Sequence, residues 1–240
     1  MSLIYLIGGA TFSKMDSLNI DMDIIKETHK TNPNVLYIGA ANLDKDKNYY
    51  QFKEYYEKIG AKVSRLLLFS KKLSKEELIL YLNNLDVIYI GGGLTYRLYE
   101  IFIKNDIKWF LYEAIKRNII ICGMSAGANI LCDFGHSDND AYRYGDTNLN
   151  YSYQKGLGLI RGIFCPHYDS LGKTSFHELV KELDIDGYAL EDGTALKISN
   201  DKFCLVKENH KNAFMLLKKD NHRLEYLVSN KNYEMKLGEY

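Results

Sequence analysis

The sequence has 240 residues, of which 46% are hydrophobic and 26% are charged, a composition typical of a folded globular protein. Its 31 basic and 31 acidic residues give a formal net charge of zero, so the charge does not favour nucleic acid or any other polyanion as a partner. The N-terminal residues lack the basic start of a signal peptide, and we identify no apolar stretch long enough to span a bilayer. We therefore expect a cytoplasmic protein with no nucleic-acid partner and no membrane partner.

The four cysteines are scattered through apolar segments and form no C-x-x-C pair. This pattern is typical of buried reduced thiols, and it favours neither a disulfide framework nor a metal site. We expect no metal and no cofactor. No linker or repeat interrupts the chain, which favours a single domain over residues 1–240. A monomer and a homodimer are both compatible with the sequence.

Short apolar runs alternate with helical patterns through the first half of the chain. Runs of Val, Ile and Leu without polar alternation predict buried parallel strands, and apolar residues at i, i+3 and i+4 predict helices between them. The predicted strands are 3–7, 35–38, 63–69, 87–90 and 119–122. The predicted helices are 21–30, 48–59, 74–82, 94–103 and 107–116. Ser70 or Ser74 can cap the third, and Ser74-x-x-Glu77 is a capping box. The fold class is therefore α/β, a three-layer sandwich with a mostly parallel central sheet.

The pattern changes after residue 135. Residues 135–158 are polar and irregular, and we expect them to fold over the functional site. An apolar strand at 160–166 precedes a helix at 174–183, for which Ser175-x-x-Glu178 is a possible cap. Short runs then predict strands and hairpins that complete the sheet, at 188–190, 195–198, 202–206, 213–217 and 223–228.

The most informative motif is a G-x-S-x-G pattern made by Gly123, Ser125 and Gly127, between an apolar strand and the start of a helix. A strand-to-helix elbow holds its serine in a strained turn and exposes the hydroxyl at the carboxyl edge of the sheet. The N–H groups of the following helix would face a developing oxyanion. We interpret Ser125 as a nucleophile; the alternative is a glycine-rich turn that only packs or holds a phosphate.

Small residues also follow three other predicted strands, at Gly8-Gly9, at Gly39-Ala40 and at Gly91-Gly92-Gly93. Ligands of parallel sheets bind outside the carboxyl ends of the strands, so these turns are expected around the serine. The triple glycine suits a backbone N–H that faces the serine, because residues without Cβ let a substrate carbonyl approach closely. It does not match a phosphate-binding loop.

A nucleophilic serine needs a base. His167 follows an apolar strand and Pro166, so it is expected at the same sheet edge as the elbow, and we predict it to be the general base. His136, close after the elbow helix, is a rival. The remaining histidines are interpreted as structural or exposed: His29, His177, His210 and His222. The candidates for the carboxylate that orients the imidazole are Asp138, Asp140, Asp146 and Asp169, and position alone does not separate Asp140 from Asp169.

These motifs together resemble the S51 peptidases, the family of peptidase E (an α-aspartyl dipeptidase) and cyanophycinase. The resemblance rests on Ser-Ala-Gly-Ala-Asn at 125–129, on the triple glycine with Thr95, and on Pro166-His167. It extends from Leu-Ile-Gly-Gly at 6–9 to Glu-Asp-Gly-Thr-Ala-Leu at 191–196. It implies a class I glutamine amidotransferase-like (flavodoxin-like) α/β fold, with serine in place of the amidotransferase cysteine.

The resemblance also implies roles for individual residues. Ser125 matches the nucleophile, His167 the base, and Asp140, in the pair Asn139-Asp140, the acid of the triad. The backbone N–H groups of Gly92 and Ala126 match the oxyanion hole. Residues expected near the substrate are Gly93, Leu94, Thr95, Asp169 and Lys173.

The chain departs from the family pattern at two places. The family usually reads G-G-G-N-T, and Leu94 stands here in place of the asparagine. We therefore expect a preference that is relaxed or shifted away from an N-terminal aspartyl residue. The arginine that resembles a substrate-carboxylate clamp, after the family histidine, has no clear counterpart, although Lys173 or Arg161 could serve.

The predicted function is a serine exopeptidase or dipeptidase that hydrolyses short peptides through a Ser-His-Asp triad, with a small peptide as its substrate. An esterase-like hydrolase and a catalytically idle binding protein on the same fold are the alternatives. An amidotransferase would need a cysteine where Ser125 stands.

Overall fold

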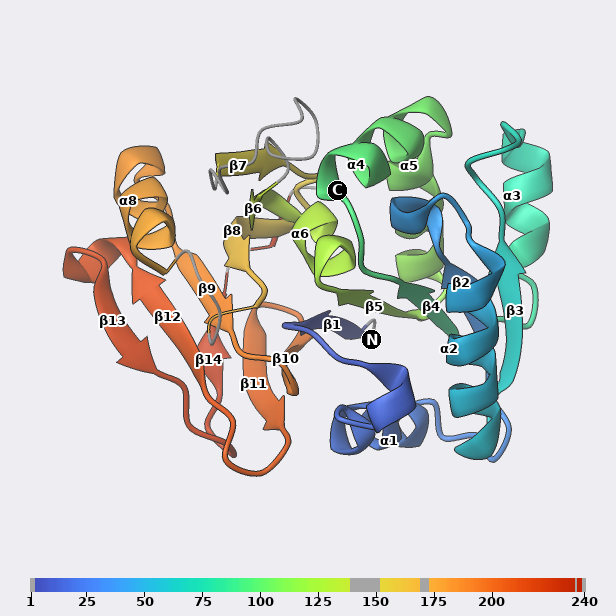
Figure 1. Cartoon of the computed structure of the whole chain (residues 1–240), viewed down its shortest axis with the longest axis horizontal. Coiled ribbons are helices and arrows are strands. Elements are labelled where there is room, and N and C mark those ends of the chain that lie inside the picture. The colour runs from blue at the N-terminus through green and yellow to red at the C-terminus, as the bar shows by residue number, and fades with distance from the viewer. Residues whose placement is uncertain (1–2, 139–151, 169–172, 236, 239–240) are drawn as a thin grey trace.

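Two β-sheets organise the chain, and helices pack against both (Figure 1). The computed structural model describes residues 3–138, 152–168, 173–235 and 237–238. The first sheet has eight strands in the order β14-β11-β10-β1-β5-β4-β2-β3, and the second has six in the order β13-β12-β9-β8-β6-β7. The molecule is therefore an α/β protein with two mixed sheets.

The strands of the first sheet are β1 (Leu3–Ile7), β2 (Asn34–Ile38), β3 (Lys62–Leu66), β4 (Val87–Ile90), β5 (Ile120–Met124), β10 (Thr194–Ser199), β11 (Lys202–Lys207) and β14 (Tyr233–Glu234). The strands of the second are β6 (Cys132–Ser137), β7 (Ser152–Lys155), β8 (Ile160–Cys165), β9 (Gly187–Leu190), β12 (Ala213–Leu217) and β13 (Arg223–Tyr226). The α-helices are α1 (Leu18–Glu27), α2 (Asp46–Lys58), α3 (Lys75–Tyr81), α4 (Thr95–Lys104), α5 (Ile107–Lys116), α6 (Ala126–Leu131) and α8 (Lys173–Leu183). The 3-10 turns are η1 (Phe12–Lys14), η2 (Ala40–Asn42) and η3 (Lys218–Asp220).

The first sheet contains the parallel strands that the apolar runs predicted. β1, β5, β4, β2 and β3 are parallel neighbours, so their carboxyl ends meet at one edge. β10, β11 and β14 extend the sheet beyond β1 in antiparallel pairs. The edge where the parallel strands end is where a ligand is expected.

Successive side chains of the parallel strands enter two different cores. Ile4 and Leu6 of β1 pack in a mainly aliphatic cluster with residues of α4, α5 and α6. Tyr5 and Ile7 of the same strand pack in a cluster with α1 and α2, which is rich in tyrosine. This alternation, with period two, buries both faces of the strands and explains their almost continuous apolar sequence.

The second sheet corrects the predicted organisation of the second half of the chain. β9, β12 and β13 belong to this sheet, whereas we expected all the late strands to complete the first one. Within the segment 135–158, which was expected to be irregular, β6 and β7 pair in an antiparallel ladder. A run of apolar residues identifies a strand but not its partner, which explains the difference. α8 covers this sheet through Phe176 and Val180.

The two Ser-x-x-Glu motifs have different roles. The Ser74 hydroxyl accepts a hydrogen bond from the Glu77 backbone N–H, and the Glu77 carboxylate accepts one from the Ser74 N–H, so the predicted capping box is confirmed. Ser175 lies inside α8, which begins at Lys173, so the predicted cap is wrong there. Its hydroxyl instead lies 2.9 Å from Nε2 of His136.

Across the described ranges, no helix combines the length and the apolar character that crossing a membrane requires.

Candidate active site

Ser125 lies at the elbow between β5 and α6, as the G-x-S-x-G pattern predicted. Its backbone has φ 54° and ψ −114°, a conformation that residues other than glycine rarely adopt. Its N–H donates to the carbonyl of Ile7 at the end of β1. Gly127 is required here because a Cβ at this position would lie 2.1 Å from the carbonyl oxygen of Ile90. The parallel sheet therefore fixes the strained serine from both sides.

His167 follows β8, so it reaches the serine from the second sheet. Its Nε2 lies 2.6 Å from Ser125 Oγ, a hydrogen-bonding distance. Its φ of 135° is also unusual for a residue with a side chain. The following N–H, that of Tyr168, donates to the carbonyl of Leu190, the last residue of β9. Both residues of the pair are thus held in strained backbone conformations by the strands around them.

Asp192 completes a chain of three polar groups. It lies in the turn between β9 and β10, and its Oδ1 accepts a hydrogen bond from His167 Nδ1 at 2.6 Å. The hydrogen bond from His167 lowers the pKa of Asp192 below its ordinary value, so the carboxylate is charged at neutral pH. Gly9 lies directly against this pair. A Cβ at this position would lie 2.0 Å from Asp192 Oδ1, so a larger residue would displace the carboxylate. The Gly193 N–H donates to the Gly9 carbonyl and ties this turn to the end of β1.

Asp192 is the functional candidate that sequence reasoning missed. Asp140 and Asp169, the two acids weighed most closely, lie outside the described residues. Asp192 was recognised only as part of the family segment 191–196, and no role was assigned to it. The available signal was its place directly after the apolar run 188–190, because a turn at the end of such a strand can reach the same edge as His167.

His136, the rival base, does not contact Ser125 through any bond that the structure gives. It is buried in β6, with Nδ1 3.4 Å from Cys165 Sγ and Nε2 beside Ser175 Oγ. Burial lowers its pKa to about 4, so the imidazole is neutral at pH 7. The geometry therefore favours His167 as the partner of the serine.

The two residues predicted for the oxyanion hole lie next to Ser125. Ala126 opens α6 directly after Ser125, and Gly92 lies so close that a Cβ there would be 3.2 Å from Ser125 Cβ. The Gly92 carbonyl accepts a hydrogen bond from Asn42 Nδ2, at 2.5 Å. This bond fixes the peptide that follows Gly92. Both residues predicted for the oxyanion hole therefore lie next to Ser125.

Asn129 connects these two loops. It is almost fully buried in α6, and its Nδ2 donates to Thr95 Oγ1 at 3.2 Å and to the His136 carbonyl at 3.2 Å. Because Thr95 begins α4, three residues after Gly92, the amide couples the elbow helix to the triple-glycine loop. The hydroxyl of Thr95 is itself buried against this amide.

The other predicted substrate residues are placed as follows. Gly93 has φ 142° and packs against Ala41, whose carbonyl oxygen would lie 2.7 Å from a Cβ at this position. Leu94 is the N-cap residue of α4 and provides no side-chain cap. Arg161 lies at the start of β8, the end opposite His167, and bonds Asp133, so it is distant from Ser125 along the strand. The side chain of Lys173 lies outside the described residues.

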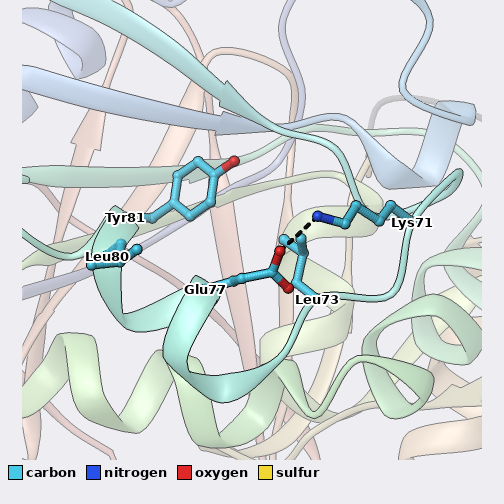
Figure 2. Close-up of a pocket in the computed structure, with 5 residues that line it drawn as sticks. All are labelled: Lys71, Leu73, Glu77, Leu80 and Tyr81. Carbon is cyan, nitrogen blue, oxygen red and sulfur yellow. Dashed lines mark hydrogen bonds and ion pairs between the residues drawn. The ribbon is translucent and has the colours of Figure 1, made fainter.

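A separate hollow lies beside α3, near the edge of the first sheet (Figure 2). It has a volume of about 370 Å³ and is lined by Lys71, Leu73, Glu77, Leu80 and Tyr81. Its two charges satisfy each other, because Lys71 Nζ and Glu77 Oε1 form an ion pair of 2.6 Å. It holds none of the three groups at Ser125. Among the described residues no cluster of His, Cys, Asp or Glu could hold a metal ion.

Comparisons with known proteins find similarity to peptidases. The model of peptidase family S51 matches residues 4–206. The uncharacterized peptidase YgaJ of Bacillus subtilis (strain 168) is 31% identical over 206 residues, which are 84% of this chain and 85% of the relative. Peptidase E of Streptomyces coelicolor is 24% identical over 143 residues, which are 55% of this chain and 57% of the relative.

Two crystal structures share the fold. A peptidase from an acI-B1 actinobacterium aligns with a TM-score of 0.70 at 17% identity, over 98% of this chain and 97% of the other. A peptidase E-type protein from Listeria monocytogenes EGD-e aligns with a TM-score of 0.63 at 20% identity, over 87% of this chain and 100% of the other. The match of the family model over most of the chain is decisive: this protein belongs to peptidase family S51, a family of serine peptidases.

Proposed function

We propose that this protein is a serine exopeptidase or dipeptidase that hydrolyses short peptides, with Ser125 as the nucleophile. The observation that carries the proposal is the chain of hydrogen bonds from Ser125 Oγ to His167 Nε2 and from His167 Nδ1 to Asp192 Oδ1. A serine, an imidazole and a carboxylate in this order are the groups that acyl transfer needs.

In the proposed reaction Ser125 Oγ attacks the carbonyl carbon of the peptide bond while its proton moves to His167 Nε2. The carbonyl oxygen becomes an oxyanion that the N–H groups of Gly92 and Ala126 stabilise. The imidazolium then protonates the leaving amine as the C–N bond breaks. Water, deprotonated by His167, attacks the acyl-enzyme and releases the new carboxylate and the serine.

In this proposal Asp192 replaces Asp140 as the acid of the triad. An orienting carboxylate must accept a hydrogen bond from Nδ1–H, so that Nε2 is free to take the serine proton. Asp192 meets this condition among the described residues, and its lowered pKa keeps it charged for the imidazolium that forms.

The finer description of the fold belongs to the same proposal. Helices on both faces of the parallel strands favour the three-layer, class I glutamine amidotransferase-like arrangement, in one domain over residues 1–240. Four free cysteines, three of them buried, favour a reducing compartment such as the cytoplasm.

The test combines a covalent probe with turnover. We expect a fluorophosphonate to label wild-type protein at Ser125 and to leave Ser125→Ala unlabelled, and dipeptide hydrolysis to fall at least 1,000-fold in that variant. Ser70→Ala, in an exposed turn, is the matched control. Full peptidase activity in Ser125→Ala would falsify the proposal. Labelling together with ester but not peptide turnover would indicate the esterase, and a folded protein that resists labelling would indicate the binding protein.

A further inference from the structure

His167, the proposed base, lies in a segment whose backbone is strained. Its φ of 135° is a value that residues with a side chain rarely adopt. Such a conformation persists only where the surrounding structure fixes it, so contacts of the neighbouring residues must hold His167 in place. Two of these neighbours, Cys165 and Tyr168, have buried side chains with polar partners on other elements of the fold.

Tyr168, the residue directly after His167, connects the proposed base to the proposed acid through its backbone. Its N–H donates to the carbonyl of Leu190, the last residue of β9, and Asp192 follows Leu190 by two residues. A shift of Tyr168 would therefore move the imidazole of His167 and disturb the turn that contains the carboxylate. The contacts that fix the Tyr168 side chain thus also fix the geometry of the three polar groups.

The side chain of Tyr168 is bound by His177, in the second turn of α8. Its hydroxyl lies 2.5 Å from His177 Nε2, and the two rings stack, with centroids 6.0 Å apart and an interplanar angle of 17°. Phe176 and Phe214 pack against the same tyrosine ring, at 6.3 and 4.8 Å between centroids. The bond to His177 therefore fixes the polar end of a ring that packs among aromatic side chains.

The ionisation of the two groups defines the direction of this hydrogen bond. Burial raises the pKa of Tyr168 to about 12, so the hydroxyl keeps its proton. Burial, and the nearby charge of Lys181, lower the pKa of His177, so its imidazole is neutral at pH 7. The Tyr168 O–H is therefore the donor and His177 Nε2 is the acceptor, which places the imidazole proton on Nδ1.

Helix α8 also reaches the chain before His167. The Ser175 hydroxyl oxygen lies 2.9 Å from Nε2 of His136, and Nδ1 of the same imidazole lies 3.4 Å from Sγ of Cys165, two residues before the proposed base. The helix, which packs against the second sheet, thus holds the segment around His167 on both sides (Figure 1). The contact is direct at His177 and passes through His136 at Ser175.

We propose that His177 is a positioning residue for the reaction, which holds His167 in place through its bond to the Tyr168 hydroxyl. This rests on the proposed peptidase function. Among the described residues the structure gives no bond between His177 and Ser125, His167 or Asp192, so its effect on turnover is indirect. A misplacement of about 1 Å can lower a rate about 100-fold, and a misplaced base affects the chemical step rather than substrate binding.

The experiment measures kcat and KM in variants of this bond, with a dipeptide of the X-Leu series that wild type hydrolyses. Tyr168→Phe removes only the donor and His177→Leu removes the acceptor, so we expect each to lower kcat about 10- to 100-fold with KM little changed. The double variant should lose no more than either single variant, because both remove the same bond. His177→Gln, whose amide oxygen can accept where Nε2 accepts, should keep kcat within about threefold of wild type.

Tyr226→Phe is the matched control. Tyr226 packs against the same Phe214 ring, at 4.6 Å between centroids, but it is exposed, so the loss of its hydroxyl should leave kcat unchanged. Denaturant titration measures the stability of each variant, and kcat is compared per folded protein. A merely structural role would lower the stability without changing this kcat. An unchanged kcat in both Tyr168→Phe and His177→Leu would overturn the proposal.

An NMR measurement separates this proposal from the peptidase function. A strong hydrogen bond from imidazole Nδ1–H to a carboxylate moves its proton far downfield, so the bond from His167 to Asp192 can be followed without turnover and assigned by its loss in Asp192→Asn. We expect Tyr168→Phe and His177→Leu to shift or broaden this resonance, and His177→Gln and Tyr226→Phe to preserve it. An unchanged resonance in all four overturns the positioning role, whereas wild type that resists fluorophosphonate overturns only the catalytic proposal.

Discussion

The two sheets supply different parts of one site. The first sheet provides Ser125 at the end of β5 and the triple glycine at the end of β4, both predicted from apolar runs that end in small residues. The second sheet provides His167 at the end of β8, and Asp192 lies where the chain passes from β9 back to β10 of the first sheet. The proposed nucleophile thus belongs to the regular parallel strands, and the proposed base and acid depend on how the second sheet packs against the first.

The largest expected effect tests Asp192 as the proposed acid of the triad. Asp192→Asn keeps the size of the side chain but can present its NH₂ to Nδ1, which favours the wrong imidazole tautomer, so we expect kcat to fall about 10,000-fold. Asp140→Asn should reduce kcat less than tenfold. Steady-state kinetics on a dipeptide measure both. An unchanged kcat in Asp192→Asn together with a large loss of kcat in Asp140→Asn would instead favour Asp140, the acid that the family resemblance implies.

The pH dependence of the same variants sharpens this test. The pKa of Asp192 is lowered by its bond from His167, so its charge, and the stability it provides, are present above the ordinary pKa of an aspartate and are lost as pH falls through the lowered value. Asp192→Asn should therefore lose less stability than wild type as pH falls through that lowered value, and denaturant titrations at acid pH measure the difference. An equal acid dependence of stability in the two proteins would contradict the stabilising bond from His167 to the Asp192 carboxylate.

The same contrast explains what the sequence could predict. The five parallel strands and the elbow follow from local signals, which are apolar runs without alternation and glycines at their ends. His167 was also found, because proline and histidine end an apolar run. Asp192 required knowledge of which sheet β9 and β10 join, and pairing between distant strands leaves no local mark on the sequence. The serine at 175 was misread because the same three-residue spacing occurs inside a helix as well as at its start.

The next prediction compares Gly127 of α6, which packs against the first sheet, with Gly187 of the second sheet. A Cβ at Gly127 would lie 2.1 Å from the backbone oxygen of Ile90, which cannot move without displacing β4. A Cβ at Gly187 in β9 would meet a side-chain methyl of Val180 at 2.6 Å, which α8 can accommodate more easily. We expect Gly187→Ala to destabilise the fold by about 1–3 kcal/mol and Gly127→Ala by more. Chemical denaturation measures both, and equal losses would show that the elbow is no more rigid than the second sheet.

Two buried ionisable groups, Asp21 and His136, should change the free energy of unfolding in opposite directions as pH falls. Burial raises the pKa of Asp21 to about 6, although the hydroxyls of Tyr56, Tyr55 and Ser17 donate to its carboxylate. Its contribution to stability is complete below pH 4 and is lost as pH rises through 6. Burial lowers the pKa of His136 to about 4, so its contribution is complete above pH 6.5 and is lost as pH falls through 4.

Each group shifts the free energy of unfolding by about 3 kcal/mol between pH 4 and pH 7, in opposite directions, so the two effects nearly cancel in wild type. We expect Asp21→Asn to become relatively more stable as pH rises from 4 to 7, compared with wild type. His136→Gln should become relatively more stable as pH falls over the same range. Denaturant titrations at the two pH values measure this, and parallel responses of the two variants would contradict the assignment.

The smallest expected effect is on stability, and it distinguishes Ser74 from Ser175, the two serines of the Ser-x-x-Glu motifs. Ser74 is exposed and caps α3, so Ser74→Ala should cost about 1 kcal/mol, while Ser74→Asp, another good cap, should cost little. Ser175→Asp introduces the same residue inside α8, where its carboxylate would lie beside the buried imidazole of His136. It should raise the pKa of that imidazole and lower the stability at pH 7, since a buried charge is formed. Thermal unfolding and imidazole titration by NMR measure both. If Ser175→Asp proved as mild as Ser74→Asp, with the titration of His136 unchanged, Ser175 would not contact that histidine, and the link between α8 and β6 would have to come from apolar packing alone.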